Sequence, residues 1–322
     1  MTKTSTYEII NNADLYPYNT FWIAAKADYL AKIQSIAGAK ELFSDTSYHS
    51  LPHLILGDGS NILLTGDYKG LVVLNEITGK EIVHETENHI TLKAYAGENW
   101  HHLVEYAVER NWGGIENLSL IPGKVGAAPI QNIGAYGAEL KDVFVELEAL
   151  NLKNLATEKF DKTACEFGYR DSVFKNRYKD QYLILSVTLE LTKKPEINTT
   201  YGALQKAIDE KGLKDPSIKD ISQLVSDIRR SKLPYPDELG NSGSFFKNPV
   251  VDQSRFMELR DQFPDMPFYQ LPNEQVKIPA GWLIEQSGMK GYREGQVGTH
   301  QKQALVVVNY GGATGKEVYD FA

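Results

Sequence analysis

Residues 121–137 read Ile-Pro-Gly-Lys-Val-Gly-Ala-Ala-Pro-Ile-Gln-Asn-Ile-Gly-Ala-Tyr-Gly, and this stretch decides the fold. It holds four glycines, three alanines and two prolines, and Lys124 is its only side chain with a full charge at neutral pH. A backbone with so few side chains can approach another molecule closely, and its N–H groups can bind an anion such as a diphosphate. We interpret the 121–137 stretch as a cradle for a large planar cofactor with a diphosphate. The alternative is an ordinary buried glycine-rich turn.

Apolar residues recur within the same stretch, at Ile121, Val125, Ile130 and Ile133. A fully exposed loop would rarely contain these residues, because large apolar side chains are most often buried inside a folded chain. We therefore predict that the stretch is packed against a hydrophobic core from behind.

A second glycine-rich segment, Gly57-Asp58-Gly59-Ser60-Asn61, follows a predicted strand at 53–56 and precedes an apolar run at 62–64. Strand, glycine turn and strand predict a hairpin-like unit. The turn offers two polar side chains, Ser60 and Asn61, and bare N–H groups, which suit phosphate binding. It is not a Rossmann fingerprint, because no Gly-x-Gly-x-x-Gly opens a helix here. Taken alone, this 57–61 loop could equally be a plain turn.

Composition narrows the class of protein. The chain has 322 residues, which predicts two or three domains. Hydrophobic residues make up 42% and charged residues 24%, enough for a packed core. The net charge of −8 argues against a nucleic-acid surface.

Cys165 is the single cysteine, so no internal disulfide can form. The first residues lack the apolar core of a signal peptide, and no apolar run reaches the roughly 18 residues of a membrane span. These features favour a soluble cytoplasmic enzyme without a membrane partner.

The periodicity of apolar residues predicts a mixture of helices and strands. Spacings of three and four predict helices, and short β-branched runs predict strands. Predicted helices cover 24–38, 97–108, most of 199–232, 280–286 and 317–322, and predicted strands cover 53–56, 71–74, 81–83, 90–95, 143–152, 181–191 and 304–309. Pro234 and Pro236 stop the helix before them, which marks a candidate domain boundary. Neighbouring histidines His101 and His102 would point to different faces of a helix, so we predict no metal site.

Three polar positions stand out beyond the glycine-rich segments. Arg170 lies among aromatic residues beside Asp171, and it is either one half of a structural ion pair or a cation held to receive an oxyanion. Arg229, Arg230 and Lys232 form a small basic cluster, a pattern also typical of a solvated helix end. Ser244 lies between a glycine and two phenylalanines. No Gly-x-Ser-x-Gly elbow surrounds it, which argues against a hydrolase nucleophile.

Four motifs together resemble one family. The 57–61 loop, the 121–137 stretch, Phe167-Gly-Tyr-Arg-Asp-Ser172 and Gly243-Ser-Phe-Phe-Lys-Asn-Pro249 stand in the order found in UDP-N-acetylenolpyruvoylglucosamine reductases. The resemblance runs from about Asn19 to the last residue. It implies an α+β FAD-binding fold of the vanillyl-alcohol-oxidase (PCMH) type, with FAD-binding subdomains at 1–78 and 79–232 and an α+β substrate domain at 233–322. Tyr201, before Gly202, resembles the tyrosine of the loop that marks the first subtype of the family.

The resemblance also implies an activity and a set of site residues. The activity is reduction of UDP-N-acetylglucosamine enolpyruvate to UDP-N-acetylmuramate for peptidoglycan precursors, with FAD as cofactor, NADPH as hydride donor and a monomeric enzyme. Arg170 matches the residue that meets the developing negative charge, and Ser244 matches the proton donor. Positions expected to hold the substrate are Tyr201, Arg229, Lys232, Asn248, Lys290 and Gln303. Positions expected to hold FAD are Gly57, Asp58, Gly59, Ser60, Asn61, Pro122, Gly123, Gly126, Ala127, Ala128, Pro129, Gln131, Asn132, Gly134, Ala135, Tyr136 and Gly137.

One feature of the family has no match in this sequence. The resemblance implies a glutamate near the C-terminus, in a Glu-Pro-Glu-like segment, and neither Glu317 nor Asp320 stands in that context. We expect roughly the last 20 to 30 residues of the family pattern to be absent from this chain, with protonation of the intermediate impaired as a result. Two other hypotheses stay open at this point. They are a flavin oxidase of the same cofactor fold, and a flavoprotein that binds its ligands without catalysis.

Overall fold

A computed structural model describes residues 6–199, 201–272 and 274–322. The chain forms two compact units, each of them assembled from segments that are separate in the sequence. Unit 1 takes its described residues from Met1–Leu15, Ala25–Gly59 and Asp67–Ser231, and unit 2 comprises Tyr16–Ala24, Ser60–Gly66 and Lys232–Ala322.

A four-stranded sheet in the order β1-β2-β4-β3 forms one part of unit 1. Its strands are β1 (Tyr7–Asp14), β2 (Lys26–Ile33), β3 (His53–Leu56) and β4 (Tyr68–Asn75). Strand β1 runs antiparallel to β2, whereas β4 runs parallel to both β2 and β3. The last six residues of β4 are buried, as expected for a strand with parallel neighbours on both sides.

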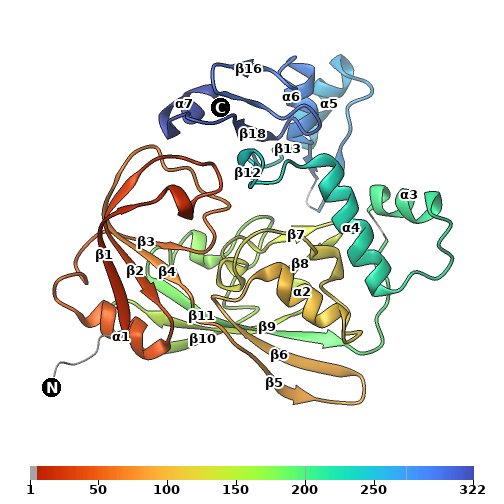
Figure 1. Ribbon diagram of the computed structural model, residues 1–322. Coiled ribbons are helices and arrows are strands. Elements are labelled where there is room, and N and C mark those ends of the chain that lie inside the picture. The colour runs from red at the N-terminus through yellow and green to blue at the C-terminus, as the bar shows by residue number, and fades with distance from the viewer. Residues whose placement is uncertain (1–5, 200, 273) are drawn as a thin grey trace. The chain divides into compact units, whose positions relative to one another are not determined.

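A five-stranded antiparallel sheet in the order β10-β9-β11-β6-β5 forms the other part of unit 1 (Figure 1). Its strands are β5 (Lys80–Glu85), β6 (His89–Tyr95), β9 (Phe144–Asn151), β10 (Thr157–Asp161) and β11 (Tyr182–Thr192). A short ribbon pairs β7 (Gly134–Ala135) with β8 (Ala138–Glu139). The helices assigned mainly to this unit are α1 (Ile36–Ser44), α2 (Trp100–Val108), α3 (Gly202–Glu210) and α4 (Ile218–Lys232).

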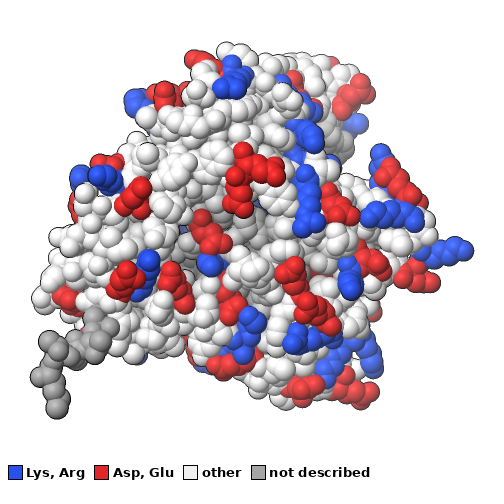
Figure 2. All heavy atoms as spheres, viewed as in Figure 1, with Lys and Arg blue, Asp and Glu red and all other residues white. Residues whose placement is uncertain are grey.

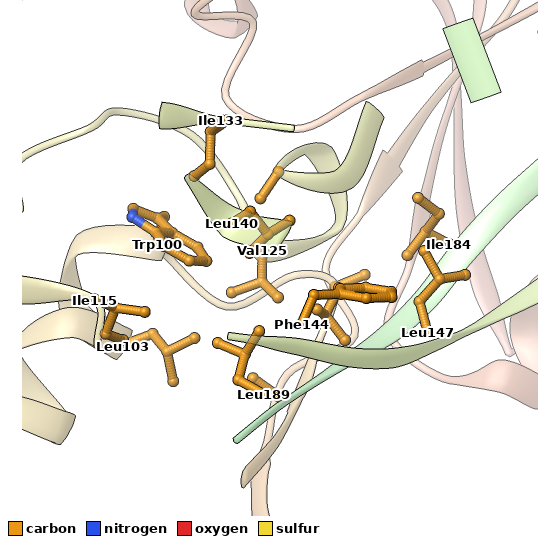
Figure 3. Close-up of a cluster of buried hydrophobic side chains, with 14 of the residues drawn as sticks. Trp100, Leu103, Ile115, Val125, Ile133, Leu140, Phe144, Leu147, Ile184 and Leu189 are labelled. Carbon is orange, nitrogen blue, oxygen red and sulfur yellow. The ribbon is translucent and has the colours of Figure 1, made fainter. Parts of the chain in front are cut away.

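The main core of unit 1 lies between the five-stranded sheet and α2. Trp100 and Leu103 of α2, Leu147 of β9 and Leu189 of β11 belong to one buried cluster (Figure 3). Val125 and Ile133 of the 121–137 stretch lie in the same cluster, and Ile121 and Ile130 pack against it. The prediction that this stretch is packed from behind is therefore confirmed.

Unit 2 is smaller and also mixes helices with strands. One sheet has the order β12-β18-β17-β16 and another has the order β13-β15-β14. The strands are β12 (Gly240–Ser244), β13 (Val250–Asp252), β14 (Tyr269–Leu271), β15 (Gln275–Lys277), β16 (Arg293–Glu294), β17 (Val297–Thr299) and β18 (Val306–Asn309), and the helices are α5 (Gln253–Gln262), α6 (Ala280–Gln286) and α7 (Gly315–Phe321). In the described residues of both units, the helices are too short or too polar to cross a bilayer.

Two predicted elements are wrong. Residues 24–38 were predicted as a helix, but β2 occupies Lys26–Ile33 and α1 begins only at Ile36. The alanines and leucine of this segment favour a helix in isolation, and pairing with β1 and β4 overrides that preference. The predicted hairpin around the 57–61 loop is also absent, because residues 62–64 form no strand. Strand β3 pairs instead in parallel with β4.

Candidate cofactor and substrate site

The 57–61 loop and the 121–137 stretch meet in unit 1 at Lys124. A Cβ built on Gly57 would lie 3.1 Å from Cγ of Lys124, so the lysine stem packs closely on this glycine. The ammonium of Lys124 lies 3.3 Å from Oδ1 of Asp58, and both side chains are about a third exposed. The loop after β3 and the stretch after α2 are thus held together by one ion pair and one glycine contact.

Backbone N–H groups at this meeting point fit a cofactor diphosphate. Within the described part of the chain, the N–H groups of Gly57 and Asp58 donate to no protein acceptor. Gly59 and Gly123 have φ of +60° and +116°, in a region that L side chains rarely adopt. With the Lys124 ammonium beside them, these groups have the donor chemistry that an anion requires. The residues present therefore fit a dinucleotide cofactor.

The 121–137 stretch is fixed in place by backbone hydrogen bonds to the core. Val125 and Gly126 donate to the carbonyls of Glu98 and Ala96, each at 2.9 Å. A Cβ on Gly126 would lie only 2.5 Å from Cβ of Ala96, so this glycine serves packing within the protein. Asn132 is fully buried with φ of +43°, and its amide donates to Glu139 and to the carbonyl of Gly168.

A cavity of about 240 Å³ opens between the two glycine-rich segments and the chain before β11. One wall consists of Leu56, Gly57 and Lys124, and another includes Ala127 and Ile130. The lining also includes aromatic and charged residues from the chain before β11 and its first residue, namely Phe174, Lys175, Tyr178, Lys179, Asp180 and Tyr182. Apolar walls with a few polar groups are typical of cofactor sites. The volume accommodates part of a dinucleotide.

Arg170 lies against the 121–137 stretch. Its Nη2 donates to the carbonyl of Gly134 at 2.6 Å, and its backbone has φ of +53°. No ion pair with Asp171 forms among the described residues, because the Asp171 carboxylate accepts instead from Asn176 at 3.0 Å. The structural Arg–Asp pair considered from the sequence is therefore not made. The remaining N–H groups of Arg170 make no hydrogen bond within the described chain, so they can receive an anion.

Two predicted substrate residues also lie near this stretch. The rings of Tyr136 and Tyr201 meet edge to face with centroids 5.2 Å apart. Nε of Arg229, on α4, donates to the carbonyl of Leu120 at 3.1 Å. Burial raises the pKa of Tyr136, and the nearby positive charge of Arg229 opposes that effect. Unit 1 therefore brings Arg170, Tyr201 and Arg229 to one segment of backbone.

Ser244 is presented at the end of β12 in unit 2. The pairing of β12 with β18 shifts register between Asn241 and Ser244, which is a β-bulge. Buried Asn241 holds this bulge, since its Oδ1 accepts from the N–H of Gly243 at 2.9 Å and its amide donates to the carbonyl of Leu239 at 2.8 Å. Bulges of this kind re-aim the side chain that follows them. In this chain, the side chain of Ser244 after the bulge is exposed.

Other predicted substrate residues gather around the start of α6. Oδ1 of Asn248 accepts from the N–H of Ala280 at 2.9 Å. A Cβ on Gly281 would lie 3.3 Å from Oε1 of Gln303, so Gln303 reaches the same turn. Lys290 is paired with Glu285 at 2.7 Å, just beyond the end of α6. Lys232 ends α4 and is exposed, outside this group of contacts.

The remaining predicted FAD residues differ in exposure. Ser60 and Asn61 fall in unit 2, while the rest of the 57–61 loop falls in unit 1. In the 121–137 stretch, Gly123, Ala128, Pro129, Asn132 and Gly134 are buried, Gly126, Gln131, Ala135 and Tyr136 are half-buried, and Pro122, Ala127 and Gly137 are exposed.

Sequence reasoning missed most of the residues that line the cavity, among them Lys124, Lys175, Tyr178 and Lys179. Lys124 was singled out as the only charge in its stretch, and that signal could have assigned it to the cofactor. The other three belong to a basic and aromatic run before β11, which lines the cavity only because the fold brings it there.

On the face shown in Figure 2, acidic and basic side chains are interspersed.

Comparisons with known proteins show the family of this chain. A family model described as FAD binding domain matches residues 27–154, and one described as UDP-N-acetylenolpyruvoylglucosamine reductase, C-terminal domain, matches residues 234–322. Similar proteins with the name UDP-N-acetylenolpyruvoylglucosamine reductase come from Amoebophilus asiaticus (52% identity, 98% of this chain and 93% of the relative), Flavobacterium johnsoniae (48%, 97% and 92%) and Pseudomonas aeruginosa (47%, 97% and 91%).

A solved structure supports the fold. The crystal structure of UDP-N-acetylenolpyruvylglucosamine reductase from Thermus caldophilus superposes with a TM-score of 0.68 at 21% identity, covering 98% of this chain and 92% of that one. The predicted fold class, an α+β FAD-binding fold followed by a C-terminal α+β domain, is confirmed, with FAD as the cofactor. The chain belongs to the UDP-N-acetylenolpyruvoylglucosamine reductase family.

Proposed function

We propose that this protein reduces UDP-N-acetylglucosamine enolpyruvate to UDP-N-acetylmuramate, with FAD as the bound cofactor and NADPH as the hydride donor. The observation that carries the proposal is the placement of Arg170 against the 121–137 stretch, in a chain of this family. A fixed cation at the cofactor segment suits a reaction in which negative charge develops on the substrate.

The chemistry of the bound cofactor sets what the residues must do. Bound FAD would supply hydride, taken from NADPH, for transfer to C3 of the enolpyruvyl group. Negative charge then spreads from C2 of the substrate into its carboxylate. Arg170 meets that charge with the N–H groups that the Gly134 carbonyl does not occupy. A donor held in place before the reaction lowers the barrier without reorganisation at the moment of charge development.

Ser244 supplies the proton to C2 of the substrate. A serine hydroxyl is a weak acid in water, but the charged substrate is a strong base, so position matters more than acidity. The bulge held by Asn241 fixes the backbone on which Ser244 is presented. Lys232, Asn248, Lys290 and Gln303 bind the UDP part, since ammonium and amide groups neutralise and donate to a diphosphate. Tyr201 and Arg229 also bind the substrate.

The visible spectrum of the purified protein tests this proposal. We expect a flavin absorption band that bleaches on anaerobic addition of NADPH and returns when UDP-N-acetylglucosamine enolpyruvate is added. Rapid bleaching by an alcohol, with none by NADPH, would replace the proposal with a flavin oxidase. A thermal shift with ligands but no NADPH oxidation would leave a binding protein without this activity.

A further inference from the structure

Asn117 joins two segments that the proposed function assigns to different ligands. It lies in a short 3-10 helix, Glu116–Leu118, and only 2% of it is exposed. Its Nδ2 donates to the carbonyl of Tyr136 at 2.8 Å and to the carbonyl of Asn198 at 2.9 Å. Tyr136 belongs to the 121–137 stretch, and Asn198 stands three residues before Tyr201. One buried amide group thus holds both segments.

Two further contacts join the same segments. Nδ2 of Asn198 donates to the carbonyl of Gly137 at 3.1 Å. The ring of Tyr201 packs edge to face on the ring of Tyr136. Tyr136 and Gly137 have φ of +48° and +85°, so this turn keeps a left-handed conformation that its surroundings must maintain.

The chemistry of the amide explains why the position needs asparagine. Both partners of Nδ2 are carbonyl oxygens, which only accept hydrogen bonds, so the side chain must offer two donors at one atom. Aspartate has the same shape but presents only acceptors when ionised. Aspartate at this buried position would leave the two carbonyls without their donor and face them with a negative charge, which is costly.

We propose that Asn117 is a positioning residue that couples the cofactor site to the substrate tyrosine. FAD on the 121–137 stretch restrains Tyr136 and Gly137, and Asn117 transmits that restraint to Asn198 and Tyr201. Tyr201 is then held for the substrate only when the cofactor is bound. Because coupling between sites is reciprocal, a substrate that engages Tyr201 tightens FAD binding in return. This inference rests on the proposed function for the role of Tyr201.

Hydrogen exchange measures the coupling without turnover. We expect FAD to slow amide exchange in the wild-type peptides that contain Asn198 and Tyr201. In Asn117→Asp, FAD should still protect the 121–137 stretch while its effect around Asn198 is lost. Asn154→Asp is the matched control, since it makes the same change of charge at an exposed residue whose Oδ1 only accepts, from Ala156. Equal protection of the Asn198 peptides in wild type and Asn117→Asp would overturn the inference.

Steady-state kinetics supply the second readout. Asn117→Asp should raise the KM for UDP-N-acetylglucosamine enolpyruvate roughly 2- to 30-fold, a range found for residues that modulate coupling, with a smaller effect on kcat. If Asn117→Asp fails to fold, Asn198→Ala removes the contact to Gly137 outside the core and should shift KM in the same direction. An unchanged KM in folded variants overturns the inference. A wild-type protein without turnover instead overturns the proposed function, and the exchange experiment then decides the coupling alone.

Discussion

Lys124 connects the two glycine-rich segments, and its position explains a feature of the sequence. It is the single charged side chain of the 121–137 stretch, and it lies both in the cavity wall and 3.3 Å from Asp58. Its aliphatic stem packs on Gly57, and its ammonium lies beside Asp58 in the same loop. A cation there offsets the charge of a diphosphate.

Lys124→Met should therefore weaken FAD binding while it keeps the apolar stem. Loss of a charge-assisted contact costs about 1.5 kcal/mol or more, which is roughly a tenfold rise in Kd. The measurement is a titration of apoprotein with FAD followed by flavin fluorescence. Lys159→Met serves as the control, because Lys159 pairs with Glu146 on the five-stranded sheet away from the cavity. An unchanged Kd for Lys124→Met would remove this lysine from the cofactor site.

Ser244→Ala separates the two halves of the proposed reaction. Reduction of the flavin by NADPH should be unaffected, whereas oxidation of the reduced flavin by the enolpyruvyl substrate should slow by roughly 10²- to 10⁴-fold, the usual contribution of a positioned proton donor. Stopped-flow absorbance measures both steps. Ser287→Ala, which loses only a hydrogen bond to the carbonyl of Ile284, is the control. Equal rates for Ser244→Ala and wild type in the second step would assign the proton to another group.

At the scale of elements, seven of the eighteen strands and most of the helices in the described residues could be predicted from periodicity. The apolar runs of β6, β9 and β11 and the three-four spacing of α2 were read correctly. Strand β2 was predicted as a helix because its alanines and leucine favour a helix locally. Pairing with β1 and β4 makes it a strand instead. The parallel pairing of β3 with β4 could not be predicted, since the two strands are separated by a loop whose 60–66 part belongs to unit 2.

A substitution at Gly126 tests whether the 121–137 stretch depends on its close packing against Ala96, the residue that follows β6. Gly126→Ala places a Cβ against Ala96, so we expect a loss of about 1–3 kcal/mol in the free energy of unfolding. Chemical denaturation of the apoprotein measures it. Gly202→Ala is the matched control, because a Cβ there meets nothing within 4 Å, and it should change stability by less than about 0.5 kcal/mol. Equal stability of the two variants would show that the stretch has room to shift.

At the scale of the whole chain, contacts between residues far apart in the sequence decide which segments make up each unit. The amide of Asn309 donates to the carbonyl of Phe21 at 2.8 Å, and the N–H of Asn241 donates to the carbonyl of Thr20 at 2.8 Å, which place residues 16–24 in unit 2. No local pattern encodes such contacts. The glycine-rich segments, Arg170 and Ser244 could be singled out as candidates from the sequence because they lie in short motifs. Asn117 and the cavity lining at Lys175–Lys179 could not, because their contacts depend on the fold.

The stability of the whole protein should depend on pH through His101. Burial lowers the pKa of His101, and His102, Arg229 and Arg230 lower it further, while Glu105 opposes them. The folded state therefore binds the proton less readily than the unfolded chain, and stability falls as the pH drops below the ordinary histidine value of about 6.5.

His101→Gln removes this titration and can keep the acceptor that the N–H of Leu120 now finds at Nδ1 of His101. Urea unfolding at neutral and mildly acidic pH measures the effect. The variant should lose less stability than the wild type between the two conditions. The same loss in both proteins would mean that other groups account for the acid sensitivity.

The central claim is that the 57–61 loop and the 121–137 stretch hold FAD, and a crystal structure of the FAD complex tests it most directly. The account predicts the cofactor diphosphate against the N–H groups of Gly57 and Asp58 and the ammonium of Lys124, with Arg170 beside the flavin ring. A diphosphate bound away from both segments, or an Arg170 guanidinium remote from the flavin, would contradict it.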